Sequence, residues 1–339
     1  MQRAGIAHEA ELHTVDQMRA GMNVVIDERN ACSSNPKVVI LVTTSVNYFD
    51  RRTVIRNTWA KLARERYDMR TLFVLARSPD GDVMEKVLQE SRDHQDILMG
   101  DFIESYYNLT LKTVFALNWM NQTCKADFMV KMDDDVVLNP GNLLSLVHGL
   151  KDTGSVYCNL RQWDWPVRER DHKNYVSYHV FPDEYWPDYC SGAGVVMSSE
   201  TAGTLVEGAL RNDTNPKIWV DDCFMYGIVA QKVGVSCHDV STIRVAGFYA
   251  ENSCFPIVYN YSIIMGQVMW HQLSGLWERG EQSPGCLPYN WMSWFITLLP
   301  FLVIFMIIVK GSSSVRNVKL LWTWNAGRRR TFLAKIWQL

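Results

Sequence analysis

Strand-like and helix-like segments alternate along the chain from Lys37 to about Gly234, and this alternation limits the possible folds more than any other feature of the sequence. The segment that begins at Lys37, KVVILVT, is a run of β-branched and aliphatic residues, which is typical of a strand buried on both faces. The next segment, DRRTVIRNTWAKLARERY, has apolar residues at helical spacing between Val54 and Leu62. Because helical crossovers connect parallel strands, we predict an α/β fold with a mostly parallel central sheet.

Further strand-like runs follow and complete the predicted sheet: TLFVLA, ILMGDF, DFMVKM, SVYCNL and GVVMSS. Residues 161–190, between the last two runs, are aromatic, charged and rich in turn formers, so we interpret them as hairpins and a binding loop. A chain of 339 residues, of which 47% are apolar, is long enough for one large domain. We expect a main domain over residues 36–283, a stem or loosely ordered segment over 1–35 before it, and a separate C-terminal segment over 284–339.

The C-terminal segment contains an uncharged apolar run, Trp291–Val309. At about 1.5 Å per residue, a helix of this length just spans a hydrocarbon core of about 30 Å, so the run predicts a transmembrane helix. Basic residues follow it, beginning with Lys310, and they indicate that this end faces the cytosol and the main domain the lumen. The first thirty residues contain no comparable apolar run. The alternative interpretation of residues 291–309 is a buried core helix.

Charge and cysteine usage narrow the class of protein. The formal net charge is −2, which gives no reason to expect a nucleic-acid partner. None of the eight cysteines forms a CxxC pair, so a zinc site is not expected. Scattered cysteines, together with acceptor sequons at Asn108, Asn121, Asn212 and Asn260, favour a secretory compartment in which disulfides persist. Buried free thiols in a cytosolic protein are the alternative.

An acidic run, Asp133-Asp134-Asp135, comes directly after the strand-like DFMVKM. Three adjacent carboxylates repel one another unless a cation or hydrogen-bond donors neutralise them. Side chains alternate along a strand, so Asp133 and Asp135 are expected on one side and Asp134 on the other. Two carboxylates on one side can hold a hard divalent ion and leave positions open for phosphate oxygens. The alternative is an acidic turn that caps the following helix.

A second acidic pair, Asp221-Asp222, lies at a predicted helix start, where the helix dipole stabilises a carboxylate. Such a carboxylate can deprotonate an acceptor hydroxyl, although simple capping of the helix is the alternative. The stretch Tyr185–Gly194 combines aromatic rings, which can stack on sugars, with small residues that let backbone approach a ligand. Its alternative is a glycine-containing turn before a strand.

Five sequence blocks follow one another over about residues 37–240: Arg52–Trp59, Asp101–Thr113, Lys131–Val137, Tyr189–Gly194 and Val220–Gly227. In this order they resemble the β-1,3-galactosyltransferase-like family of inverting glycosyltransferases. That family includes β-1,3-N-acetylglucosaminyltransferases and, more distantly, the Fringe proteins.

The resemblance implies a GT-A type fold that binds a UDP-sugar, UDP-galactose or UDP-N-acetylglucosamine, and usually Mn²⁺. It implies that Asp135, helped by Asp133, faces the metal, and that Asp222 is the catalytic base. We further expect the donor nucleotide to be contacted by Arg56, Lys112, Asp133 and Asp134. The implied reaction is the inverting transfer of galactose to a hydroxyl of a glycan acceptor on protein or lipid, giving a β-1,3 linkage. The implied location is the Golgi membrane, with a lumenal catalytic domain.

The sequence departs from the family pattern at a few positions. Cys223 replaces the usual valine, Ala60 stands where glycine is common, and a late histidine near the metal is missing. His238 and His271 are the nearest substitutes, and both are expected to be structural or surface residues. The missing histidine leaves a second hypothesis open, in which the chain is a non-catalytic carbohydrate-binding relative.

Overall fold

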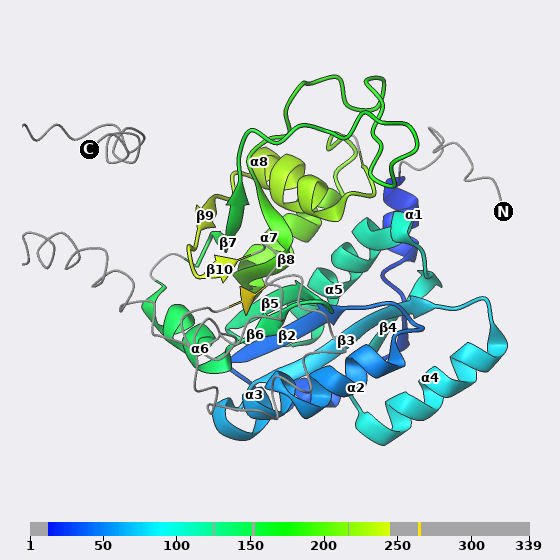
Figure 1. The fold of residues 1–339 in the computed structure, drawn as a ribbon, viewed down its shortest axis with the longest axis vertical. Helices are drawn as coiled ribbons and strands as arrows, with labels where there is room; N and C mark the ends of the chain where they lie inside the picture. The colour runs from blue at the N-terminus through cyan, green and yellow to red at the C-terminus, as the bar shows by residue number, and fades with distance from the viewer. Residues whose placement is uncertain (1–12, 125, 151–152, 216, 245–263, 266–339) are drawn as a thin grey trace, which may run out of the picture. The chain divides into compact units, whose positions relative to one another are not determined.

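The computed structural model describes residues 13–124, 126–150, 153–215, 217–244 and 264–265, and Figure 1 shows their arrangement. An eight-stranded sheet has the strand order β1-β4-β3-β2-β5-β8-β7-β9. Its strands are β1 (Val24–Ile26), β2 (Val38–Thr43), β3 (Arg70–Arg77), β4 (Ile97–Ile103), β5 (Phe128–Asp133), β7 (Val156–Arg161), β8 (Tyr189–Ser198) and β9 (Cys237–Asp239). A smaller sheet consists of β10 (Ile243–Arg244), β11 (Ile264–Met265) and β6 (Val137–Leu138).

The large sheet is mixed, with antiparallel pairs among its parallel ones, so the prediction of a mostly parallel sheet holds in part. Strand β2 pairs in parallel with β3 and β5, and β3 pairs in parallel with β4. Strand β8 instead runs antiparallel to both β5 and β7, and β1 runs antiparallel to β4. The loop before β8 reverses the chain without a helical crossover, and a reversal of that kind can only produce an antiparallel neighbour.

Helices cover both faces of the sheet (Figure 1). The helices are α1 (Val15–Ala20), α2 (Phe49–Asn57), α3 (Trp59–Tyr67), α4 (Gly81–His94), α5 (Leu109–Thr123), α6 (Pro140–Gly149), α7 (Ser199–Ala209) and α8 (Ala230–Val233), with short turns η2 (Arg29–Cys32) and η3 (Tyr106–Asn108) and the π-helix η4 (Cys223–Val229). Alternate residues of β2 enter different cores: Leu41 packs with α5 and α7, whereas Ile40 packs with α3 and α6. Strand β2 is therefore buried on both faces, as its apolar sequence predicts.

The predicted helix over residues 50–67 is interrupted. Helix α2 ends at Asn57 and α3 begins at Trp59, because Thr58 has non-helical dihedral angles (φ −113°, ψ −115°). Its hydroxyl donates to the carbonyl of Val54 at 2.8 Å, a local bond that competes with the regular helical pattern.

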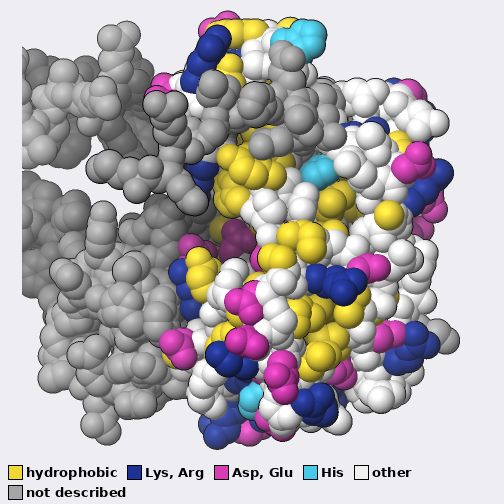
Figure 2. Space-filling view, turned by 90° about the vertical axis from the view of Figure 1, so that its right-hand side faces the viewer, with side chains coloured by type: hydrophobic (Ala, Val, Ile, Leu, Met, Phe, Trp, Pro, Cys, Tyr) yellow, Lys and Arg dark blue, Asp and Glu magenta, His cyan; other side chains and the backbone are white. Residues whose placement is uncertain are grey.

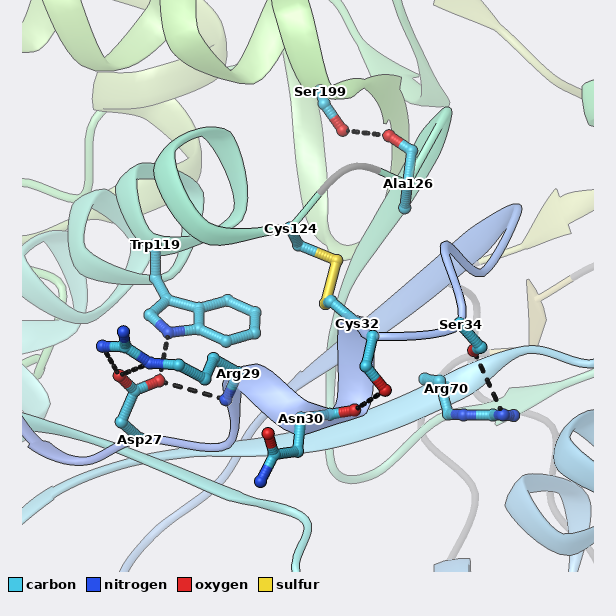
Figure 3. The surroundings of a disulfide bond; sticks show 11 residues. Asp27, Arg29, Asn30, Cys32, Ser34, Arg70, Trp119, Cys124, Ala126 and Ser199 are labelled. Carbon is cyan, nitrogen blue, oxygen red and sulfur yellow. Dashed lines mark hydrogen bonds and ion pairs between the residues drawn. A yellow bond between two sulfur atoms is a disulfide. The ribbon is translucent and has the colours of Figure 1, made fainter.

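Residues 13–35 pack onto the domain, although the sequence predicts a loosely ordered stem for them. Met18 of α1 is 1% exposed, and β1 extends the sheet beside β4. A disulfide joins Cys32 to Cys124 at the end of α5, as Figure 3 shows. Beside it, the indole Nε1 of Trp119 donates to Asp27 at 3.0 Å. The segment is attached by the packing of α1, by strand pairing, by the disulfide and by the hydrogen bond to Trp119, and its mostly polar sequence does not predict these contacts.

Breaking this disulfide is expected to lower the stability of the domain. The bond closes a loop with a sequence separation of 92. Loss of a cross-link over a loop of that size increases the entropy of the unfolded chain, so Cys32→Ser together with Cys124→Ser should lower the free energy of unfolding by about 2–5 kcal/mol. Urea denaturation followed by tryptophan fluorescence measures the change. The control is Cys237→Ser, which leaves the disulfides intact; equal urea midpoints for the double variant and the control would contradict the expectation.

Residues 162–188 form a long loop, drawn in green at the top of Figure 1. The predicted hairpins are not formed there: within this loop only an isolated bridge joins Val167 to Tyr175. A second disulfide, between Cys158 of β7 and Cys190 of β8, ties the strands that flank the loop. The disulfide therefore holds the two ends of the loop close to each other.

The predicted C-terminal helix lies outside the described residues. The chain divides into two compact units, Met1–Cys286 and Leu287–Leu339, and the second lies wholly outside them. Within the described part of the chain, no helix has both the length and the apolar character needed to cross a membrane.

On the face shown in Figure 2, acidic and basic side chains are interspersed.

Candidate active site

A cleft of about 940 Å³ opens at the carboxyl ends of β2 and β5. Its walls come from these strand ends, from the turn before α5, from the start of β8 and from the start of η4. The long loop contributes Asp164, Trp165 and Trp186. Ligands of α/β proteins bind at this edge of a sheet, because the loops that follow the strands converge there. Both acidic groups singled out from the sequence, Asp133–Asp135 and Asp221–Asp222, line this cleft.

The three carboxylates of the acidic run have different surroundings. Strand β5 ends at Asp133, and Asp134 and Asp135 lie in the turn that follows, so strand alternation does not separate them as predicted. Asp134 is 9% exposed; its carboxylate accepts from Thr44 Oγ1 at 2.6 Å and pairs with Arg51 at 2.6 Å. Asp133 accepts from Thr43 Oγ1 at 2.9 Å. Asp135 is exposed in the cleft.

Asp133 and Asp135 line the cleft and are the carboxylates that could hold a divalent cation there. Although Asp135 is exposed within the cleft, the surrounding cleft walls partly desolvate it, and together with the charges of Asp133 and Asp134 this raises its pKa to about 6. Burial also raises the pKa of Asp133. A carboxylate pair with this excess of negative charge and hard oxygen donors suits a hard cation that takes its remaining ligands from a substrate or from water. The described residues contain no cluster of three or more metal-binding side chains, so such an ion would be only partly enclosed by protein.

Lys131 is buried at the centre of the site, and the sequence interpretation gave it no role. Its Nζ lies 3.2 Å from Asp133 Oδ1, 3.2 Å from Asp221 Oδ2 and 3.2 Å from the carbonyl oxygen of Gly192. Burial disfavours the charge on Lys131, yet the neighbouring carboxylates of Asp133 and Asp221 raise its pKa. The signal in the sequence was its spacing, since residues 131 and 133 of one strand share a face.

The carboxylates of Asp221 and Asp222 have different hydrogen-bond and ion-pair partners. Asp221 is 8% exposed, and its Oδ2 accepts from Thr113 Oγ1 at 2.6 Å in addition to facing Lys131. Asp222 caps η4 through Oδ1, which accepts from the backbone N–H of Cys223 at 2.8 Å. Its Oδ2 has only a long contact with the N–H of Gly192, at 3.4 Å. Burial and the charge of Asp221 raise the pKa of Asp222 to about 6. A partly buried carboxylate with this pKa can accept a proton near neutral pH.

Gly192 allows β8 to pass between the two acidic groups. A Cβ atom at this position would lie 3.2 Å from Lys131 Nζ and 3.3 Å from the Cβ of Asp222. The glycine within β8 therefore allows close packing against Lys131 and Asp222, whereas the sequence predicted a close approach of backbone to a ligand.

Lys112 lies in the cleft wall, whereas Arg56 does not reach the cleft. The buried Nζ of Lys112 donates to Thr44 O at 2.9 Å and pairs with Glu104 at 2.6 Å. Burial lowers the pKa of Lys112, and the negative charge of Glu104 offsets only part of this effect. Arg56 instead pairs with Glu90 at 2.7 Å and Asp96 at 2.7 Å, beside a separate cavity of about 250 Å³. Of the predicted site residues, only Arg56 does not line the cleft.

Aromatic side chains from the long loop complete the rim. Trp186 is 8% exposed and packs on Phe181 with ring centroids 4.3 Å apart. Trp165 is 71% exposed. Tyr106, before α5, donates to Asn174 at 2.5 Å, and burial together with nearby acidic charges raises its pKa to about 12. Its hydroxyl therefore remains protonated and able to donate at neutral pH.

The two substitutes considered for the late histidine do not add to the site. His238 is exposed on β9, stacks on Tyr157 at 5.3 Å and is not among the residues that line the cleft. His271 lies outside the described residues.

The chain is similar in sequence to proteins of known family. The family described as Galactosyltransferase matches residues 50–241. Beta-1,3-galactosyltransferase 1 of Homo sapiens and of Mus musculus is 32% identical over 260 residues, which cover 75% of this chain and 77% of that protein. Human lactosylceramide 1,3-N-acetyl-beta-D-glucosaminyltransferase is 31% identical over 230 residues, covering 63% of this chain and 59% of that protein.

Among solved structures, galactosyltransferase LgtC in complex with donor and acceptor sugar analogs has 12% sequence identity and a TM-score of 0.39. The match covers 75% of this chain and 99% of LgtC.

Proposed function

Because the chain belongs to the galactosyltransferase family and is a glycosyltransferase, we propose that it transfers galactose from UDP-galactose to a hydroxyl of a glycan acceptor on protein or lipid. We propose a GT-A type fold for the domain, a β-1,3 linkage, as the name of the 32% identical relative suggests, and inversion at the anomeric carbon. The observation that carries the proposal is the placement of Asp222, with a pKa of about 6, in one cleft with Asp133 and Asp135.

Asp222 has the position and charge of a general base. Its Oδ2, the less occupied oxygen, accepts the proton of the acceptor hydroxyl. The acceptor oxygen bonds to the anomeric carbon while the bond from that carbon to the diphosphate breaks, and the electron pair leaves with the diphosphate. We assign Asp221 a structural role instead, because its Oδ2 accepts from Thr113 and pairs with the buried Lys131. Lys131 then holds Asp133 and Asp221 in place during transfer.

Asp133 and Asp135 would hold Mn²⁺, whose positive charge, when the ion is bound, stabilises the departing diphosphate. Lys112, Asp133 and Asp134, which line the cleft, stay the proposed nucleotide-side residues. Both carboxylate oxygens of Asp134 already have protein partners, Thr44 and Arg51. We therefore propose that Asp134 acts on the nucleotide indirectly, through its ion pair with Arg51.

A panel of UDP-sugars tests the proposal. Purified protein with Mn²⁺ is incubated with UDP-galactose, UDP-N-acetylglucosamine or UDP-glucose and with glycans ending in galactose or N-acetylglucosamine. We expect UDP release to be fastest with UDP-galactose, and a β-1,3-specific galactosidase to remove the added sugar. Failure of every donor to bind or to release UDP would refute the proposal.

A second candidate donor is UDP-N-acetylglucosamine, which is favoured by the 31% identity to a relative named as a 1,3-N-acetylglucosaminyltransferase. The chemistry is the same, and the same panel separates the two donors. A non-catalytic carbohydrate-binding protein is indicated instead if wild type and Asp222→Asn are equally inert while glycan still binds.

We also propose that the catalytic domain works in the lumen of the Golgi, attached to its membrane. The disulfides Cys32–Cys124 and Cys158–Cys190 support an oxidising compartment. The sequon asparagines Asn121 and Asn212 are exposed, as N-glycosylation requires.

Glycosidase treatment of protein from secretory cells should therefore increase its mobility on a gel. Asn212→Gln is expected to remove one step of this shift, because Asn212 is exposed in a turn. The comparison variant is Asn108→Gln, whose asparagine is half-buried and donates to Ile103 O at 2.8 Å, so little shift should depend on it. Protein that carries no glycan and is protease-sensitive in permeabilised cells with intact Golgi would contradict a lumenal location.

A further inference from the structure

A second cavity adjoins the cleft and has an aromatic wall. Its volume is about 530 Å³. One wall comes from the long loop, with Trp163, Tyr185 and Trp186, and the other from η4, the start of α8 and the segment that follows α8. Trp186 lines both the cleft and this cavity, so the two hollows share a wall.

Two of these aromatic side chains are exposed to an unusual degree. Trp163 is 74% exposed and Tyr185 is 41% exposed, and their rings meet edge to face with centroids 6.1 Å apart. Exposed aromatic rings forgo the free energy that their burial would contribute to folding. A group of such rings on a surface therefore commonly marks a binding site.

The backbone of Trp163 is in the left-handed region, with φ at 59°. A bulky residue rarely takes this conformation, and residues held there concentrate at ligand-binding positions. Here it separates two tryptophans that are close in sequence: Trp165 lines the cleft, whereas Trp163 lines the second cavity.

Asp164, which lies between the two tryptophans, anchors this arrangement. Its carbonyl accepts from the N–H of Trp186 at 2.8 Å. Its carboxylate accepts from Arg161 at 2.8 Å and from the hydroxyl of Tyr189 at 3.0 Å. The aromatic rings are therefore presented from a fixed backbone, which limits the entropy lost when a ligand binds.

We propose that the second cavity binds the inner sugars of an acceptor oligosaccharide whose reacting end occupies the cleft. This inference rests on the proposed glycosyl transfer and assigns its acceptor class: an oligosaccharide rather than a single sugar. The C–H face of a sugar ring packs on Trp163 and Tyr185, and the rim offers hydrogen-bonding groups in Asp188 and Gln231. Because Trp186 lines both, the two sites are adjacent.

Acceptors of different length test the proposal. Chito-oligosaccharides of one to four sugars, and the same series ending in galactose, are assayed with UDP-galactose and Mn²⁺. For wild type, KM should fall with acceptor length. Trp163→Ala and Tyr185→Ala should raise the KM of the longest acceptor about tenfold, with the KM of UDP-galactose and of the monosaccharide unchanged.

Tyr178→Ala is the matched control. Tyr178 belongs to the same loop and is 65% exposed, but it lies against Arg168 and lines neither hollow. All three side chains are exposed, so unchanged thermal midpoints are expected and verify folding. Active wild type without length dependence, or equal effects of Trp163→Ala and Tyr178→Ala, would overturn the proposal.

Direct binding separates this inference from the proposed transfer. The quenching of tryptophan fluorescence by the tetrasaccharides is titrated with wild type and with Trp163→Ala. If wild type transfers no sugar, the proposed function fails, but quenching that requires Trp163 still supports the glycan site. Absence of quenching in wild type overturns the site whatever the activity.

Discussion

Asp222→Asn is expected to lower the rate of sugar transfer by about 10²–10⁴-fold, the usual contribution of a positioned general base. The amide keeps an oxygen that can cap η4 through the N–H of Cys223, so the fold should be unchanged. UDP binding should also be unchanged, because the proposed nucleotide and metal contacts lie on the other acidic run. Transfer rate at saturating donor, and UDP affinity by calorimetry, measure the two effects.

The pH profile gives an independent check of the same residue. The pKa of Asp222 is raised to about 6, and only the ionised carboxylate can accept a proton. The wild-type rate should therefore fall as the pH decreases through about 6, nearly tenfold per pH unit below it. At saturating Mn²⁺ a bound cation lowers the pKa of Asp135, which leaves Asp222 as the titrating group. The residual rate of Asp222→Asn should lack this dependence.

Asp93→Asn serves as the control for charge removal, since Asp93 is exposed on α4 and does not line the cleft. Full activity is expected for it. An Asp222→Asn enzyme with near wild-type turnover would show that another group takes the proton.

Asp135→Asn is expected to lower transfer by about 10²–10³-fold without loss of stability. The proposed ion would lose one of its two protein ligands, and metal stabilisation of a leaving group contributes several kcal/mol. Asp135 carries a carboxylate with a raised pKa of about 6, so the folded state disfavours its charge at neutral pH. Removing that charge should leave the thermal midpoint unchanged or slightly higher at pH 7. Activity against Mn²⁺ concentration, together with thermal unfolding, measures both.

Asp134→Asn is the matched comparison in the same turn. Asp134 is buried and paired with Arg51, so losing its charge should lower the free energy of unfolding by about 1–3 kcal/mol. The loss of stability is therefore expected for Asp134→Asn and not for Asp135→Asn. If Asp135→Asn keeps full Mn²⁺-dependent activity, Asp135 is not a metal ligand.

The acidic runs illustrate how far the sequence leads. A cluster of three carboxylates after a buried strand indicates a cation site, because like charges repel at short range. The sequence places Asp133–Asp135 correctly at a sheet edge, but the strand ends at Asp133, so strand alternation is not what buries Asp134. That outcome depends on Arg51 and Thr44, which are distant in sequence.

Two other differences have the same origin. Arg56 lies in a sequence block that matches the family, yet Glu90 and Asp96 hold it beside another cavity. The polar segment 13–35 has no apolar pattern to predict its docking, which a disulfide and a hydrogen bond to Trp119 provide. In both cases the deciding partner comes from a different element.

The sequence by itself determined the α/β character of the domain, the strand ends that carry the acids and the family, because each follows from local periodicity or from ordered motifs. The tertiary structure alone decided the mixed sheet, the central place of Lys131 and the different roles of Asp221 and Asp222. These depend on contacts between residues far apart in the chain: Lys131 becomes a bridge only when β5, β8 and η4 meet, and Thr113 and Lys131 contact Asp221 but not Asp222.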